Sequence, residues 1–196
     1  MPYPAHHKQQ TRERILKSAR HLFNKKGFAE VTIDEIMAAA ELTRGVFYRY
    51  FKTKDELYSD ALMQFACKSA PERWQRKHVD PCAEGATLAR MIMEAYLSRD
   101  HFVDRGGSCP TVGLASDVSR SSIKVKRAFR QVVEMMLDVF TVNLEGDDKS
   151  ARALALVSVC VGAMVLARAV DDADLAGAFL KAARGHVLTS AGWTDR

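Results

Sequence analysis

The stretch TIDEIMAAAELTRGVFYRYF, residues 32–51, decides the fold of this 196-residue chain. It begins with Thr32, which can cap a helix, and it places two acids in the first turn, with Glu35 at the capping-box position. A break at residues 41–42 precedes Thr43, a second candidate cap. Two short capped helices separated by a few residues are typical of a helix-turn-helix.

The second helix of this pair, residues 44–51, has an unusual composition. It holds one glycine and four aromatic residues, a mixture that intrinsic propensity disfavours in an isolated helix. A recognition helix accounts for it, because Gly45 leaves room for the close approach of a nucleic-acid backbone. Thr43 and Arg44 lie at the N-terminal end, which reads base edges in the major groove. Arginine can bind the O6 and N7 atoms of guanine bidentately.

Other side chains of this region can contact phosphates. Tyr48 and Tyr50 offer hydroxyl groups, and Lys54 adds a positive charge. We interpret Phe47 and Phe51 as core residues, because apolar rings usually pack inside. Tyr50 fits either role.

Helical periodicity dominates the rest of the chain, and no strand pattern of period two occurs. The first helix is expected at about 11–26, with Thr11 as its cap and Gly27 just after its end. Thr53 is expected to cap the helix that begins at Lys54. The sequence therefore predicts an all-α protein. Further helices are expected at about 83–100, 111–117, 121–144 and 149–169, with a last one after residue 172.

Charge is concentrated at the N-terminus. The formal net charge of the chain is +5, yet residues 1–29 hold seven Lys and Arg against Glu13 alone, which gives +6 there. Nucleic acid and an anionic membrane surface are the obvious partners of such a segment, and a merely solvated helix face is the alternative. The composition, 47% hydrophobic and 27% charged, excludes a disordered or collagen-like chain.

The cysteines and the most apolar segment point to a cytoplasmic protein without a membrane partner. Cys67, Cys82, Cys109 and Cys160 form no C-x-x-C pair and have no histidine at metal-ligand spacing, so we expect reduced thiols and no metal site. The apolar run 153–167 is shorter than the roughly 18–20 residues that span a bilayer, and we expect a buried helix there.

Two other function classes are disfavoured. The chain has no G-x-S-x-G, P-loop, H-E-x-x-H or G-x-G-x-x-G motif, and the acidic pairs 147–148 and 171–172 fit helix caps. We therefore expect no enzyme, no catalytic residue and no cofactor. A scaffold that binds membranes through the basic first helix would not need Thr43, Gly45 and Tyr48 at their spacings.

Residues 19–57 resemble the N-terminal DNA-binding domain of the TetR family of transcriptional regulators. The pattern is Ala19-x-x-Leu22-Phe23-x-x-x-Gly27-Phe28, Thr32-Ile33-x-x-Ile36-x-x-Ala39-Ala40 and Gly45-x-x-Tyr48-x-Tyr50-Phe51-x-x-Lys54-x-x-Leu57. The family often has histidine where this chain has Tyr50, which can still donate to a phosphate. The resemblance implies phosphate contacts by Thr32, Tyr48, Tyr50 and Lys54, and base contacts by Thr43, Arg44 and Gly45.

For the remainder, the resemblance implies a DNA-binding domain, residues 1–54, followed by a helical effector-binding and dimerisation domain, residues 55–196. The dimer forms through the last two helices, binds a palindromic double-stranded operator, and is released by a small-molecule effector, most often as a repressor. The residues agree, because segment 149–169 is apolar nearly all round and a monomer would expose too large an apolar patch.

The effector itself is not identified by the sequence. We expect a pocket for an apolar or aromatic molecule among the helices at 83–100, 111–117 and 121–144, although its residues also fit an ordinary core. Cys109 precedes a possible helix N-terminus, so its oxidation or alkylation is an alternative signal; a small buried side chain is the other interpretation. The candidate lining residues are Met91, Tyr96, Phe102, Cys109, Phe129, Val133 and Met136.

Overall fold

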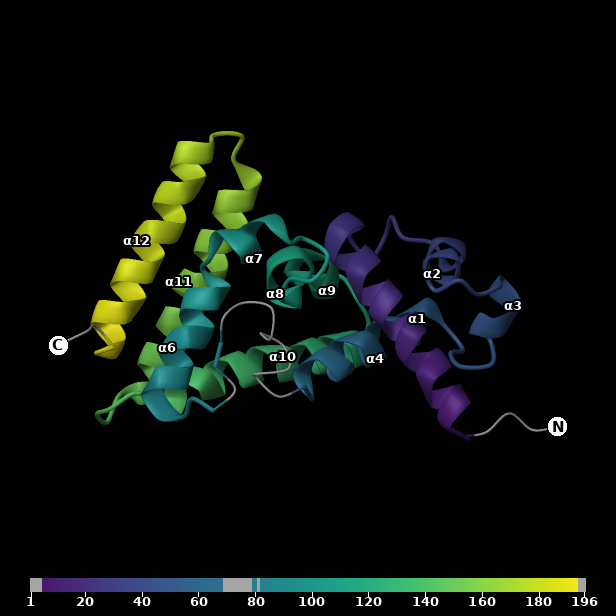
Figure 1. Cartoon of the computed structure of the whole chain (residues 1–196), viewed down its shortest axis with the longest axis horizontal. Helices are drawn as coiled ribbons and strands as arrows, with labels where there is room; N and C mark the ends of the chain where they lie inside the picture. The colour runs from purple at the N-terminus through teal and green to yellow at the C-terminus, as the bar shows by residue number, and fades with distance from the viewer. Residues whose placement is uncertain (1–4, 69–78, 81, 194–196) are drawn as a thin grey trace. The chain divides into compact units, whose positions relative to one another are not determined.

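The structure is a computed structural model that describes residues 5–68, 79–80 and 82–193. Every regular element in these ranges is a helix, so the predicted all-α class is confirmed (Figure 1). The chain divides into two compact units, residues 1–67 with 105–132 and residues 68–104 with 133–196. The predicted boundary at residue 54 separates DNA binding from effector binding and dimerisation, and it stays a prediction.

The first unit is built on four helices at the start of the chain. They are α1 (Ala5–Lys26), α2 (Ile33–Ala39), α3 (Arg44–Phe47) and α4 (Lys54–Ala66). Two short helices, α8 (Pro110–Gly113) and α9 (Ala115–Ser119), and the first part of α10 (Ile123–Thr141) belong to the same unit. Its core consists of side chains that water does not reach, among them Ile15, Leu16, Phe23, Ile36, Phe47, Phe51, Leu57 and Leu62.

The ends of the first helices follow local signals, with one correction. Thr11 is not a cap: α1 begins at Ala5, and the buried Thr11 hydroxyl donates to the His7 carbonyl oxygen at 2.9 Å. The reason is that no glycine or proline interrupts residues 5–26, so the helix extends past the apolar stripe. Gly27 ends α1 with φ +85°, a left-handed conformation that suits glycine.

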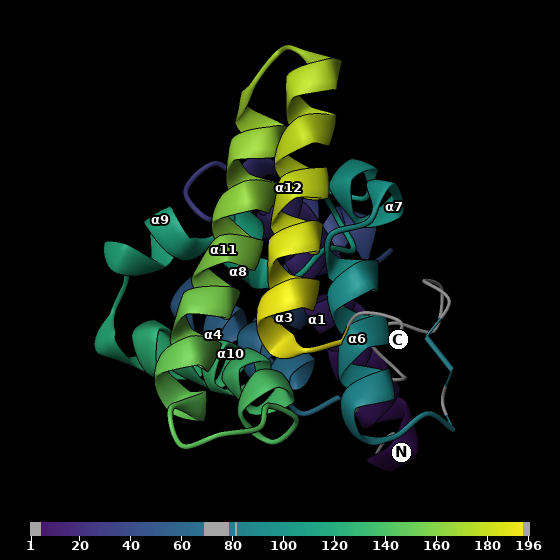
Figure 2. The same cartoon turned by 90° about the vertical axis from the view of Figure 1, so that its left-hand side faces the viewer.

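The second unit contains α6 (Gly85–Tyr96), α7 (Arg99–Val103), α11 (Lys149–Ala169), α12 (Ala173–Ala191) and the remainder of α10. Helices α11 and α12 run antiparallel and pack along each other (Figure 2). The single helix predicted for 83–100 is wrong, because the chain breaks after Tyr96 and Ser98 caps α7 by accepting from the N–H of His101 at 3.1 Å. The helix predicted for 111–117 is likewise two short ones.

Helix α11 is long and strongly apolar. By length and hydropathy alone it could cross a membrane, and 39% of its most apolar window is buried within the chain. A core helix of a soluble protein meets the same criterion, so this is weak evidence for a membrane span. Its buried side includes Ala153, Leu156 and Cys160, which pack inside the second unit.

Candidate nucleic-acid interface

The start of α2 is fixed by a reciprocal pair of hydrogen bonds. The Thr32 hydroxyl accepts from the N–H of Glu35 at 3.2 Å, and the Glu35 carboxylate accepts from the N–H of Thr32 at 2.8 Å, which is the predicted capping box. Lys26 lies 2.7 Å from the same carboxylate. The hydrogen bond from Lys26 has the largest effect on the pKa of Glu35, followed by those from Thr32, and together they lower it to about 2. This carboxylate is therefore ionised at neutral pH.

Helix α3 and the turn after it separate buried rings from exposed polar groups. The predicted helix 44–51 is too long: α3 ends at Phe47, because the N–H groups of Arg49 and Tyr50 bond to carbonyl oxygens three residues back and form a turn. Phe47 and Phe51 are 0% and 1% exposed, as predicted for core residues. Tyr48 is 56% exposed, and Thr43, Arg44 and Gly45 are exposed as well. The buried rings anchor α3 on the rest of the unit, and the side of α3 that carries Arg44 and Tyr48 is left open to a partner.

Gly45 has no packing role inside the chain. A Cβ atom built at Gly45 would meet nothing within 4 Å, so the chain's own packing does not require glycine there. Glycine in a helix is less stable than alanine by about 0.5–1 kcal/mol. The missing side chain at this exposed position instead leaves space for a partner from outside, such as a nucleic-acid backbone, to come close.

Arg44 is held in place by an acid that the sequence did not single out. Its guanidinium lies 2.6 Å from the carboxylate of Asp34 on α2, with both side chains more than half exposed. The interaction with Tyr48 raises the pKa of Arg44 most, and the negative charge of Asp34 raises it further. Because both charges are hydrated, the pair contributes little stability, and Arg44 can exchange Asp34 for a base edge. No local spacing signals a contact between residues ten apart.

Lys54 begins α4 above an aromatic ring. Its Nζ atom lies 4.3 Å from the ring centroid of Phe28 and 3.4 Å from the carbonyl oxygen of Ala29. Burial lowers the pKa of Lys54. Thr53 caps α4 as predicted, by accepting from the N–H of Glu56 at 3.0 Å.

All seven predicted DNA-contacting residues belong to the first unit. They lie at the N-caps and first turns of α2, α3 and α4 or in the turn after α3, where Tyr50 is half-buried: Thr32, Thr43, Arg44, Gly45, Tyr48, Tyr50 and Lys54. This unit holds 17 Lys and Arg against 9 Asp and Glu, a net charge of +8, whereas the second unit holds 12 against 15, or −3. A polyanionic partner therefore suits the first unit.

The predicted effector-binding residues are not brought together within one unit. Cys109 and Phe129 belong to the first unit and the other five to the second, so the pocket stays a prediction. Tyr96 is buried with its ring 4.7 Å from that of His101. Met136 is buried too, while Met91, Phe102, Phe129 and Val133 are half-buried.

A hollow of about 420 Å³ lies in the second unit, between α7 and the start of α12. Among the predicted effector residues, Phe102 lines it, together with apolar Leu97, Val170 and Leu180. Arg99, Asp171 and Asp172 also face it. Among the residues that the structure describes, no three His, Cys, Asp or Glu side chains are grouped to hold a metal ion.

Cys109 is packed inside the first unit. It is 3% exposed, and the Thr111 hydroxyl donates to its sulfur at 3.2 Å. It precedes α8, which has only four residues. An electrophile must reach a sulfur to react with it, so this burial favours the interpretation as a packed side chain over that of a sensor.

Residues 15–61 match the family described as bacterial regulatory proteins of the tetR family. Over these residues the chain is similar to the TetR family. The TetR resemblance of residues 19–57 is thereby confirmed, and several of the relatives carry the names of transcriptional regulators.

Relatives extend the TetR match to different lengths. AcrR of Shigella flexneri, an HTH-type transcriptional regulator, is 42% identical over 52 residues, which is 26% of this chain and 24% of that protein. NemR of Escherichia coli K12, an HTH-type transcriptional repressor, is 24% identical over 142 residues, or 71% of this chain and 70% of that protein. Matches at 42–46% identity span only 17–27% of the relatives' own lengths.

Solved structures resemble the fold of nearly the whole chain. The crystal structure of the reduced form of E. coli NemR has a TM-score of 0.73 at 20% identity, covering 92% of this chain and 96% of that one. A regulator of the TetR family from Agrobacterium tumefaciens has a TM-score of 0.71 at 18% identity, with 91% and 97% covered. At these identities the likeness concerns the fold alone.

Proposed function

We propose that this chain is a cytoplasmic transcriptional repressor that binds a palindromic DNA operator as a homodimer and is released by a small-molecule effector. The observation that carries the proposal is the division of α3 and the turn after it, where Phe47 and Phe51 are buried while Arg44 and Tyr48 are exposed beside the open position of Gly45. The names of its relatives, a transcriptional regulator and a transcriptional repressor, support it.

In the proposed complex each side chain has a distinct role. Arg44 and Thr43 face base edges from the start of α3, and Gly45 lets the DNA come close. Tyr48 and Tyr50 donate hydroxyl hydrogen bonds to phosphates. Thr32 and Lys54 contact phosphates from the starts of α2 and α4, where the helix N-termini also favour an anion.

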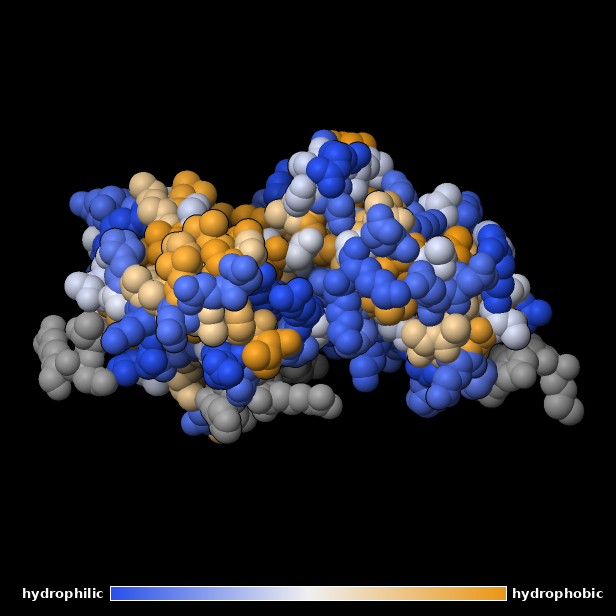
Figure 3. Space-filling model, turned by 90° about the horizontal axis from the view of Figure 1, so that it is seen from above, coloured by the Kyte–Doolittle hydropathy of each residue, from blue (hydrophilic) through white to orange (hydrophobic). Residues whose placement is uncertain are grey.

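An exposed apolar surface on α11 and α12 supports the homodimer. Leu154, Val165, Leu166 and Leu175 are 39–58% exposed in the single chain. Figure 3 shows apolar side chains gathered over the part of the surface that these helices form. A Cβ atom built at Gly162, Gly177 or Gly185 would meet nothing within 4 Å, so a second copy can come close. Two copies would bury this surface and place two α3 helices on a palindrome.

Release by an effector requires two conformations with different recognition-helix spacing. A ligand shifts the equilibrium toward release only if it binds the conformer that does not fit DNA more tightly than the conformer that does. An apolar or aromatic molecule fits the predicted lining of Met91, Tyr96 and Phe102 and its neighbours.

The proposal is tested by fluorescence anisotropy with DNA fragments that flank the protein's own gene, at several salt concentrations. We expect one fragment to bind tightly with a steep salt dependence. Tyr48→Ala should weaken binding to all DNA, whereas Arg44→Ala should cost about 1–3 kcal/mol on the operator and relax its sequence preference. Lys181→Ala, which removes an exposed charge from α12, serves as the charge-matched control and should bind like the wild type.

Weak binding without sequence preference to every fragment, and to DNA selected from a random pool, would contradict the proposal. Equal losses from Lys181→Ala and Arg44→Ala would show that only net charge matters.

A further inference from the structure

Residues 105–121 are fastened to the end of α1, within the same compact unit as the helix-turn-helix. The buried side chain of Asn24 donates from Nδ2 to the carbonyl oxygens of Gly106, at 3.2 Å, and Ser108, at 2.8 Å. Both acceptors lie more than eighty residues further along the chain. The last turn of α1 is therefore held by a segment that contributes no predicted DNA contact.

Two glycines of this segment lie close to α1, one against a side chain and one against the backbone. A Cβ atom at Gly106 would lie 2.2 Å from the ring of His21. A Cβ atom at Gly113 would lie 3.1 Å from the carbonyl oxygen of Asn24. A side chain at Gly106 would have to displace the ring of His21, and one at Gly113 would press on the backbone of Asn24, so the segment packs directly on α1.

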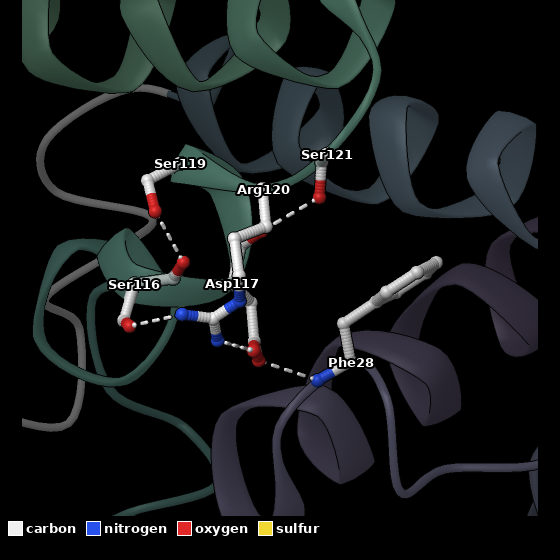
Figure 4. Close-up of polar contacts among 6 residues, drawn as sticks. All are labelled: Phe28, Ser116, Asp117, Ser119, Arg120 and Ser121. Atoms are coloured by element: carbon white, nitrogen blue, oxygen red, sulfur yellow. Dashed lines mark hydrogen bonds and ion pairs between the residues drawn. The ribbon is translucent and has the colours of Figure 1, made fainter.

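Asp117 makes the last of these contacts, and Figure 4 shows its carboxylate between the backbone of Phe28 and the side chain of Arg120. Its Oδ2 atom accepts from the N–H of Phe28 at 2.7 Å, just beyond the end of α1, and its Oδ1 atom accepts from Arg120 at 3.2 Å. The Asp117 side chain is 19% exposed and that of Arg120 is 69% exposed. At Gly27, which has φ +85°, a Cβ atom would lie 3.0 Å from Oδ2.

The ring of Phe28 carries this contact to α4. The ring of Tyr58 stacks on it at 4.5 Å with an interplanar angle of 14°, and the ammonium of Lys54 lies 4.3 Å from its centroid. A cation over a ring face is attracted by the ring quadrupole, so the place of Phe28 affects where Lys54 rests. Asp117 holds the backbone of Phe28, and the ring of Phe28 supports Lys54.

We propose that Asp117 is a positioning residue for DNA binding: it fixes Phe28 beneath Lys54 and so sets the reach of Lys54 toward a DNA phosphate. This inference rests on the proposed function, since it assumes that Lys54 contacts DNA. It adds a residue from the middle of the chain to the determinants of affinity. A ligand or modification that moves residues 105–121 then changes DNA binding through Asp117.

A double-mutant cycle tests this assignment on non-specific duplex DNA at low salt, where a phosphate contact is measured without knowledge of the operator. Asp117→Ala should weaken binding about three- to tenfold in the wild-type background, a coupling of the size found for residues in one contact network. In the Lys54→Ala background the same change should cost less than about twofold, because the phosphate contact is already lost.

Three variants separate positioning from folding. Asp117→Asn keeps one carbonyl oxygen, which can accept from the N–H of Phe28 when the amide turns that oxygen toward it, and should retain most of the affinity. Arg120→Ala leaves the Phe28 bond intact and should bind like the wild type. In the background of Arg44→Ala, which touches neither Phe28 nor Lys54, Asp117→Ala should cost the same as in the wild type.

Equal losses from Asp117→Ala in the wild-type and Lys54→Ala backgrounds would overturn the assignment and leave Asp117 a merely structural role, as would no loss in either. If Asp117→Ala does not fold, the cycle is run with Asp117→Asn and Asp117→Ser, and additive losses again refute the proposal. Failure of the proposed function is distinguishable, because it appears as a wild type that shows no preference for any operator.

Discussion

The two compact units of this chain differ in what they leave exposed. The first has a net charge of +8 and presents cations and hydroxyl groups around α3, held by ion pairs and helix caps. The second has a net charge of −3 and presents leucine and valine side chains on α11 and α12. A charged surface suits a polyanion and an apolar one suits another protein surface, so the difference supports the proposal that DNA binds the first unit and a second copy binds the second unit.

The largest effect is expected from two neighbouring residues of the first unit. Phe47→Ala should lower the free energy of unfolding by about 3–5 kcal/mol, because it removes a fully buried ring, and DNA binding should be lost with the fold. Tyr48→Ala should change stability by less than about 0.5 kcal/mol while weakening DNA binding. Urea denaturation and anisotropy measure the two quantities. Comparable destabilisation by both variants would show that the exposed face of α3 is structural.

The thiols give a comparison in which the units should behave alike. Each unit has one exposed and one buried cysteine, Cys67 and Cys109 in the first and Cys82 and Cys160 in the second. Burial raises the pKa of Cys160 to about 12. Iodoacetamide should label the exposed pair at the rate of the unfolded chain and the buried pair about a hundredfold more slowly, since their reaction requires local opening.

Peptide mapping by mass spectrometry after timed quenching follows each cysteine separately. If Cys109 reacted as fast as Cys67, burial would not protect it, and oxidation or alkylation of Cys109 would become the preferred effector signal.

A matched pair of glycines sharpens the assignment of partners. Gly185→Ala should stabilise α12 by about 0.5–1 kcal/mol in the single chain, where its methyl group meets nothing, but weaken the dimer that closes over it. Gly45→Ala should instead weaken DNA binding and leave the dimer unchanged. Sedimentation equilibrium and anisotropy on both variants test this crossed pattern. A Gly185→Ala protein with unchanged self-association would place the interface elsewhere.

The smallest effect concerns the cap of α2. The pKa of Glu35 is lowered to about 2 in the folded chain, so its contribution is present above the unfolded value near 4.5 and is lost as the pH falls through 2. Glu35→Gln should remove that part of the dependence of the thermal midpoint on pH between 5 and 2, as followed by circular dichroism. Glu30→Gln is the control. Parallel curves for wild type and Glu35→Gln would mean that the Lys26 contact does not persist in solution.

The local features of the fold could be predicted because they depend on residues three or four apart. The capping box of Thr32 and Glu35, the cap at Thr53 and the end of α1 at Gly27 are all of this kind. The prediction of Thr11 as a cap was wrong because threonine also fits inside a helix. Local sequence does not distinguish the two positions when no glycine or proline lies just before the residue.

Contacts between distant residues could not be predicted. Asp34 and Arg44 meet across a turn, and Asp117 meets Phe28 across 89 residues, and neither pairing leaves a periodic signal. A binding role for α3 and the turn after it could be predicted because the glycine and aromatic residues there make a poor helix on their own. The candidate effector residues carried no such conflict, since methionine, valine and phenylalanine are ordinary helix-core residues.

The seating of residues 105–121 on α1 also constrains how the protein is made. When residue 67 has been added to the growing chain, the first unit still lacks residues 105–132. At about 5–20 residues per second, roughly 3–13 s pass before residue 132 is added. During that interval Asn24 and the N–H of Phe28 can pair only with water, so the nascent helix-turn-helix is incomplete. The proposed DNA-binding unit is therefore completed late in synthesis, and a fragment ending at residue 67 remains in that unfinished state.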